Sequence, residues 1–240
     1  MEANKWRNTK IAGVLLIFFA VFLVSFFLGK YPIPLEVFFK AAFSRFWTIE
    51  QTWSSQVDTI LFNIRFPRII MAVIIGAGIS TAGAAYQALF QNPMVSQDIL
   101  GASQGAAFGA ALALFYNWSY ESVVSLSFIF GLAAVSVVLL INRLLHNRSP
   151  VTLILLGMMV STLFGSAVSF LKLVGDPTNT LPAITYWLMG SLSSIKNQDL
   201  VFSVPIILVG MLPILFLRWR LNLVSLGDEE ALSLGIQTRV

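Results

Sequence analysis

The chain has 240 residues, of which 57% are hydrophobic and 11% are charged, and this excludes an ordinary soluble domain because such domains carry about a quarter charged residues. The formal net charge of +4 is small, and basic residues are not clustered among aromatic ones, which argues against nucleic acid as a partner. The absence of cysteine from the chain excludes disulfides and cysteine-ligated haem or iron–sulfur centres.

Six long segments almost free of charged residues predict six transmembrane helices. A helix needs about 20 mainly apolar residues to cross about 30 Å of hydrocarbon, and six such segments cannot all be core helices of a domain this small. The expected helices cover residues 11–28, 69–90, 102–116, 122–145, 150–171 and 198–217. The predicted fold class is therefore an all-α, polytopic transmembrane helix bundle, with residues 1–240 in a single transmembrane domain.

Basic residues beside the predicted helices indicate their orientation. The clusters near helix ends are Lys5, Arg7 and Lys10, then Arg143 and Arg148, then Arg218 and Arg220. Positive-inside bias places these clusters and the N-terminus on the cytosolic side of the membrane. Residues 29–64 then form a structured external loop, and residues 218–240 form a cytosolic segment. A shorter apolar stretch, Thr185–Gly190, predicts an interfacial turn of helix because it cannot span.

Small residues recur every four positions on three predicted helices. The stripes are Gly76, Ser80, Ala84 and Ala88, then Gly101, Gly105 and Gly109, then Gly157, Ser161, Gly165 and Ser169. Such a stripe lets helix backbones approach closely, as bundles in a membrane require. We interpret the stripes first as packing surfaces. The alternative, that a stripe borders a solute passage, stays open.

Ionisable residues are missing from the middle of every predicted span. Ion-coupled carriers usually place such groups, or broken helices, at the membrane midplane, and a voltage sensor needs an arginine series. The glycine-rich Gly76–Thr81 lacks the lysine of a phosphate-binding loop, so this chain cannot hydrolyse ATP by that route. The lone His146 is interpreted as a solvated loop residue. We therefore expect no catalytic residue, no metal site and no cofactor, and another subunit would have to supply energy for uphill transport.

Three further segments have patterns that suit specific contacts. Arg65-Phe66-Pro67-Arg68 lies at the external end of the second helix, where arginine can anchor at the membrane edge or pair with a partner's carboxylate. Gln91–Gly101 joins the second and third helices on the cytosolic side as a proline-initiated turn. Ser225–Gly235 follows the sixth helix, and its three carboxylates open a short amphipathic helix, which is either an ordinary surface helix or a contact for a partner.

Together these segments resemble the FecCD permease family, the membrane subunits of bacterial ATP-driven importers for iron–siderophore chelates, haem and cobalamin, with a pattern like that of cobalamin importers. The likeness runs in order from Arg65 to the last residue, through Arg65-Phe66-Pro67-Arg68, Gly76-Ala77-Gly78 with Gly83 and Gln87, Gln91-Asn92-Pro93-Met94, Leu100-Gly101 to Gly105-Ala106, Leu155-Leu156-Gly157, Tyr186-Trp187-Leu188-Met189-Gly190, and Leu226-Gly227 to Leu234-Gly235. The resemblance implies a permease subunit of the bacterial cytoplasmic membrane that carries iron chelates (siderophore or haem) or cobalamin.

The resemblance also implies partners and roles for particular residues. Family members are similar in having ten helices, in pairing with a second permease subunit as a homo- or heterodimer, and in binding two cytosolic ATPase subunits and an extracytoplasmic substrate-binding protein. Docking of the binding protein is implied for Arg65 and Arg68. A gate or translocation pathway is implied for Asn92, Pro93, Met94, Ser149, Thr152, Gly157, Ser161 and Gly165, and ATPase coupling for Gly227, Asp228, Glu229, Glu230, Leu234 and Gly235.

Alternatives to this hypothesis stay open. The chain stops at Val240, where the resemblance implies some four further helices, so we expect a fragment or a truncated gene product. The competing functions are an ion-coupled secondary transporter, against which the missing midplane charges count, and a non-transporting membrane scaffold.

Overall fold

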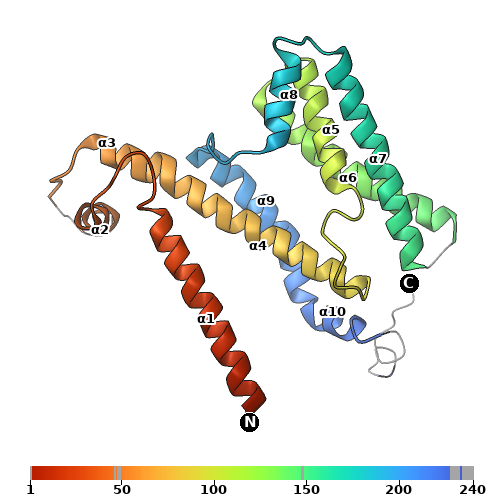
Figure 1. Ribbon diagram of the computed structural model, residues 1–240, viewed down its shortest axis with the longest axis horizontal. Helices are drawn as coiled ribbons and strands as arrows, with labels where there is room; N and C mark the ends of the chain where they lie inside the picture. The colour runs from red at the N-terminus through yellow and green to blue at the C-terminus, as the bar shows by residue number, and fades with distance from the viewer. Residues whose placement is uncertain (1, 46, 48–49, 147–148, 228–232, 234–240) are drawn as a thin grey trace. The chain divides into compact units, whose positions relative to one another are not determined.

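A computed structural model describes residues 2–45, 47, 50–146, 149–227 and 233, with side chains from residue 6 on. These residues form helices joined by turns (Figure 1), which confirms the all-α prediction. In chain order the elements are α1 (Glu2–Ser25), α2 (Leu35–Phe43), α3 (Ser55–Asp58), the π-helix η1 (Thr59–Arg65), α4 (Phe66–Leu89), α5 (Ala102–Phe115), α6 (Tyr120–Leu144), α7 (Pro150–Val174), α8 (Thr180–Met189), α9 (Asn197–Phe216) and α10 (Arg218–Val224).

Helices occupy all six positions predicted for membrane spans, but one of them is short. Among the described residues, five helical segments are long and apolar enough to cross a membrane: Trp6–Ser25, Ser55–Leu89, Tyr120–Leu144, Pro150–Val174 and Asn197–Phe216. The 14 residues of α5 extend over only about 21 Å at 1.5 Å per residue. Both ends of α5 are set by left-handed residues, because Gly101 precedes it with φ 78° and Asn117 follows it with φ 56°.

Two compact units divide the chain. The first unit consists of Met1–Ala77 with Leu192–Val209, and the second unit consists of Gly78–Ser191 with Gly210–Val240. Two helices, α4 and α9, each contribute residues to both units. Every unit therefore combines segments that are distant in sequence.

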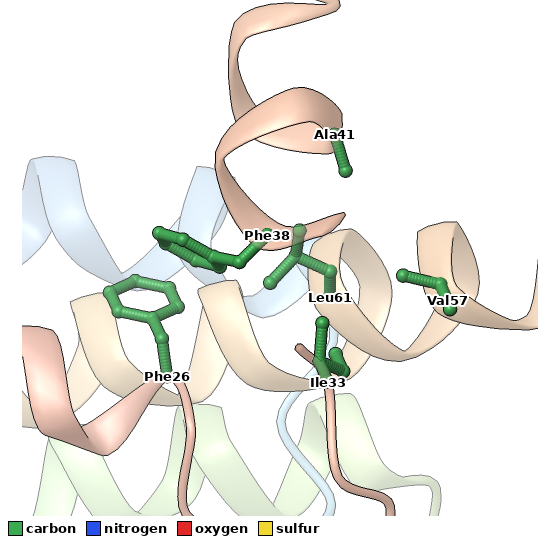
Figure 2. Close-up of a cluster of buried hydrophobic side chains, with 6 residues drawn as sticks. All are labelled: Phe26, Ile33, Phe38, Ala41, Val57 and Leu61. Carbon is green, nitrogen blue, oxygen red and sulfur yellow. The ribbon is translucent and has the colours of Figure 1, made fainter. Parts of the chain in front are cut away.

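The first unit has a hydrophobic core that lies within and beside the predicted external loop. Its buried side chains are Phe26, Ile33, Phe38, Ala41, Val57 and Leu61, which Figure 2 shows gathered between α2 and the helix formed by α3 and η1. Aromatic contacts join the end of α1 to α2, because the ring centroids of Phe26 and Phe38 are 5.3 Å apart. The described part of the segment 29–64 therefore contains helices that pack on one another.

The second membrane helix begins earlier than the predicted start at residue 69, because α3, η1 and α4 form one continuous helical segment from Ser55. The sequence does not predict this earlier start, because charged residues and Pro67 interrupt the apolar pattern. Proline has no backbone N–H and interrupts the α-helical pattern. The π-turn of η1 accommodates it, since the amide of Phe66 donates to the carbonyl of Leu61, five residues back.

In the second unit α5 packs against α6, α7 and α8. Close approach to α6 depends on two glycines: a Cβ at Gly105 would lie 2.4 Å from the carbonyl oxygen of Phe130, and one at Gly109 would lie 2.2 Å from that of Leu126. These contacts are the close packing that the small-residue stripe predicts. The predicted interfacial turn is the end of a longer helix, α8, which buries Ile184 completely and ends at Gly190, with φ 71°.

Candidate functional site

The Arg65-Phe66-Pro67-Arg68 motif lies where η1 passes into α4. Arg65 is only 8% exposed, and it is the one charged side chain buried to this degree among the described residues. Its Nη1 donates to the carbonyl oxygen of Phe26, and its Nη2 donates to that of Tyr31. The guanidinium of Arg65 is thus enclosed by the backbone that connects α1 to α2.

Arg68 makes corresponding contacts with a different connection. Its Nε donates to the carbonyl oxygen of Leu192 at 3.2 Å, and its Nη2 donates to that of Ser193 at 2.7 Å. Asn197 holds the same connection, because its Nδ2 lies 3.4 Å from the carbonyl oxygen of Phe62 and 3.2 Å from Oδ1 of Asn63. Docking by these arginines stays a prediction, and their contacts in the structure are to backbone oxygens.

The Asn92-Pro93-Met94 turn follows the other end of α4. Oδ1 of Asn92 accepts from the amide of Met94 at 2.9 Å, which is an Asx-turn. Nε2 of Gln87 donates to the carbonyl oxygen of Pro93 at 3.2 Å. The side chain of Met94 is 88% exposed. Met94, a predicted gate residue, is therefore almost completely exposed on a turn that the side-chain hydrogen bonds of Asn92 and Gln87 stabilise.

Gln91 links this turn to the end of α10. It ends α4 in the left-handed region, with φ 50°, where glycine or asparagine is usual. Its Nε2 donates to the carbonyl oxygen of Val224 at 3.0 Å. Gln91 belongs to the Gln91-Asn92-Pro93-Met94 motif, but the motif alone predicts no role for it. The sequence shows that a residue other than glycine follows the end of the helix at this position. It does not show the hydrogen-bond partner, which lies 133 positions away.

Two faces of α7 have different surroundings in the second unit. Gly157 approaches the chain before α5 so closely that a Cβ there would lie 2.0 Å from the carbonyl oxygen of Ile99. Ser161 lies against Gly101, whose added Cβ would be 2.7 Å from Oγ of Ser161, and a Cβ added at Gly165 would lie 3.5 Å from Oε1 of Gln104. These contacts support the packing interpretation of the stripe. A place for these residues in a passage stays a prediction.

The other face of α7 carries an open groove. It is lined by Leu155, Met158, Met159, Thr162, Leu163 and Ser166. The spacing of three, four, seven and eight residues places them on one side of the helix. Met159 and Leu163 are 68% and 69% exposed. The groove is uncharged and mainly apolar, with two hydroxyl groups.

The remaining predicted site residues lie near the ends of elements. Ser149 precedes α7, and the amide of Thr152 donates to its carbonyl oxygen at 3.1 Å. Gly227, with φ 117°, follows the turn after α10. The other predicted coupling residues, Asp228, Glu229, Glu230, Leu234 and Gly235, lie outside the described residues.

Comparison with known proteins gives consistent matches along the chain. The model of the FecCD transport family matches residues 15–240. The molybdate import system permease protein MolB of Haemophilus influenzae is 34% identical over 226 residues, which are 94% of this chain and 66% of that protein. The hemin transport system permease protein HmuU of Yersinia pestis is 33% identical over 186 residues, which are 75% of this chain and 55% of that protein.

A solved structure agrees in fold. It is described as an inward-facing conformation of a metal-chelate type ABC transporter, and it matches with a TM-score of 0.81 and 31% sequence identity over 96% of this chain and 69% of that chain. The chain thus spans only 66% and 55% of the lengths of the two permease relatives. The family match covers the arginine motif, the Asn92-Pro93-Met94 turn and α7 alike. This chain belongs to the FecCD transport family.

Proposed function

We propose that the chain is the membrane permease portion of an ATP-driven importer whose cargo is an iron chelate (a siderophore complex or haem) or cobalamin. Family membership supports the transport class. The two relatives above are named for molybdate and hemin, so cargo differs among similar proteins. The observation that carries the proposal is the hydrogen bond from Gln91 to Val224, because it links the residue before the turn proposed as a gate to the end of α10, which precedes the segment proposed to receive an ATPase.

The translocation pathway is proposed to use both sides of the α7 region. Asn92, Pro93 and Met94, with Ser149 and Thr152, are the proposed cytosolic gate. The uncharged groove that includes Thr162 and Ser166 suits a large solute, because an apolar wall with few hydroxyl groups offers no tight binding site. Gly157, Ser161 and Gly165 hold α7 against the 99–104 segment, and we propose that they place the groove on the pathway.

Partners are proposed at both ends of the spans. A soluble binding protein docks at the external end, where Arg65 and Arg68 lie. A cytosolic ATPase binds the segment Gly227–Gly235, and a second permease subunit completes the pathway. We propose a cytosolic N-terminus, which the basic clusters support.

Uptake measurements on the full-length protein test the proposal. The permease is placed in vesicles with its ATPase and binding protein, and uptake of a ferric siderophore, haem and cobalamin is measured in turn. We expect uptake of one of these solutes that stops on ATP depletion and survives an uncoupler. Uptake that follows the proton gradient and ignores ATP would instead establish a secondary transporter.

A substitution tests the coupling segment separately. Replacing Gly235 by valine should leave ATPase subunits bound but uncouple ATP hydrolysis from import, since a β-branched side chain alters the end of the proposed helix. Gly210→Val is the matched control, because no atom lies within 4 Å of a Cβ added there. Unaltered import by the Gly235 variant would remove this segment from the coupling role.

A further inference from the structure

Backbone carbonyls that follow helix ends surround both arginines of the motif. A buried backbone carbonyl in a connection needs a hydrogen-bond donor because no regular helix supplies one. Phe26 follows the end of α1, and Tyr31 lies in the same connection, where both accept from Arg65. Leu192 and Ser193 follow the end of α8, where both accept from Arg68. Each arginine thus satisfies two carbonyl groups on one connection.

The chemistry of the contacts suits a permanent support. Guanidinium is planar and presents several N–H donors in a fixed arrangement, so one side chain can bind two carbonyls at once. In the part of the chain that the structure describes, no carboxylate forms a salt bridge with Arg65 or Arg68. Gly29 leaves room for the first arginine, because a Cβ at this position would lie 2.6 Å from Nη2 of Arg65.

We infer that Arg65 and Arg68 are positioning residues that form an arginine clamp, defined as these two side chains and the four carbonyl groups they bind. The clamp fixes the α1–α2 connection (26–34) and the α8–α9 connection (190–196) to the start of α4. Asn197 reinforces the second connection through the carbonyl of Phe62. That carbonyl is available because the amide of Phe66 bonds to Leu61 instead and Pro67 has no amide hydrogen.

This inference does not require the proposed function. A docking arginine would be free for a partner's carboxylate until the partner arrived, and its loss would leave the unbound protein unchanged. A clamp is already engaged in the unbound protein. The two roles therefore differ in what a substitution does when no partner is present.

Hydrogen exchange on the purified full-length protein in lipid nanodiscs, with no binding protein or ATPase, tests the clamp. Within 26–34, the amides of Phe26, Phe27 and Leu28 donate to carbonyls of α1. Arg65→Gln should raise their exchange by about tenfold or more, since a hydrogen bond to a charged group is lost, and leave the 190–196 amides unchanged. Arg68→Gln should do the reverse. Arg65→Lys should fall between the wild type and Arg65→Gln, because lysine keeps a charged donor but lacks the two-pronged geometry.

Gly29→Ala keeps the test decisive if Arg65→Gln does not fold. The new methyl group must displace Nη2 of Arg65 from the carbonyl of Tyr31 while every charge stays in place. Faster exchange confined to 26–34 supports the clamp. Alanine at Gly29 also strains the backbone, because Gly29 has φ 159°. Gly190→Ala is the control for that strain, because Gly190 has φ 71° and no neighbouring side chain lies within 4 Å of a Cβ there. Exchange at 26–34 that is unchanged in Gly29→Ala, or raised no more than exchange beside residue 190 is raised in Gly190→Ala, would overturn the inference.

Discussion

The two ends of α4 are built differently although each carries a motif with a proposed function. At the first end Arg65 is 8% exposed and donates only to backbone carbonyls. At the second end Met94 is 88% exposed, and neutral amides of Gln87 and Gln91 make the contacts that shape and link the turn. Hydrogen bonds to charged groups contribute about 1.5–3 kcal/mol, whereas neutral ones contribute about 0.5–1.5 kcal/mol. The first end is thus suited to staying fixed and the second to changing.

Charge reversal at the first end should have the largest effect on stability. Arg65→Glu would place a carboxylate against the carbonyls of Phe26 and Tyr31, and an unpaired buried charge costs about 3–5 kcal/mol. We expect a lowered thermal midpoint of the full-length protein in nanodiscs. Arg45→Glu is the control, since Arg45 makes only a ring contact with Phe62 among the contacts described for it. Equal midpoints for Arg65→Glu and the wild type would show that the two ends are not different.

The next largest expected effect is on the affinity for the binding protein. If the clamp shapes the docking surface, Gly29→Ala should weaken the affinity of the transport system's own binding protein by about tenfold, although it removes no charge. The effect follows from losing one hydrogen bond to a charged group. Titration of the binding protein onto nanodiscs measures it.

The opposite pattern would establish direct contact. If Arg65→Glu weakens binding, if Gly29→Ala does not, and if lysine in place of a glutamate on the binding protein restores Arg65→Glu, then Arg65 pairs with that carboxylate. The clamp at the first end would then support no docking surface, although it could still hold the connection.

At the second end, Gln91→Gly should change coupling more than stability. Glycine suits the left-handed conformation of this residue, and that gain offsets the lost hydrogen bond to Val224, each being about 1 kcal/mol. We expect import per ATP hydrolysed to fall severalfold while the thermal midpoint stays near that of the wild type. Gln87→Ala, which removes the bond to Pro93 but not the link to Val224, is the matched comparison. Equal coupling in Gln91→Gly and the wild type would deny the link any role.

The smallest effect is expected in a surface turn outside both ends. In the α7–α8 connection, hydrogen bonds from the Thr178 amide and hydroxyl and from Asn179 hold the pKa of Asp176 below its usual value. A carboxyl with a lowered folded-state pKa stabilises the turn above its unfolded-state pKa, and that contribution is lost as pH falls through the folded-state value. Exchange of the Thr178 amide, corrected for its intrinsic rate, should therefore increase on acidification below the usual aspartate range. In Asp176→Asn this increase in exchange should be absent. An increase that persists in this variant would show that another group causes it.

The sequence predicts the helices better than it predicts their contacts. Long apolar segments reveal the spans directly, whereas the helical residues 55–68 are not predicted because Asp58, Asn63 and Pro67 are typical of a loop. The clamp left no pattern, since Arg65 and Arg68 bind backbone carbonyls that lie 39, 34, 124 and 125 positions away. Any residue can supply a carbonyl.

Spacing alone also could not assign the α7 stripe. A passage and a tight helix contact both require small residues, and the position of Ile99 beside Gly157 supports the tight contact. The groove on the other face has no small-residue signature, because Met158 and Leu163 look like any lipid-facing residues. Whether a helix face packs against a neighbour or stays open depends on which helix lies beside it, and the sequence of α7 alone does not show this.

One measurement tests most directly whether the two ends of α4 differ as proposed. Residues 1–240 contain no cysteine, so within them spin labels attach only to introduced cysteines, and any other cysteine of the assembled transporter is replaced. One label pair is placed at Met94 of two copies, and a separate pair at Leu35 and Lys196 of one copy. The distance between the Met94 labels should change between the nucleotide-free and nucleotide-bound states, while the Leu35–Lys196 distance stays the same. A Met94 distance that is equal in both states, or a Leu35–Lys196 distance that shifts with nucleotide, would contradict the account.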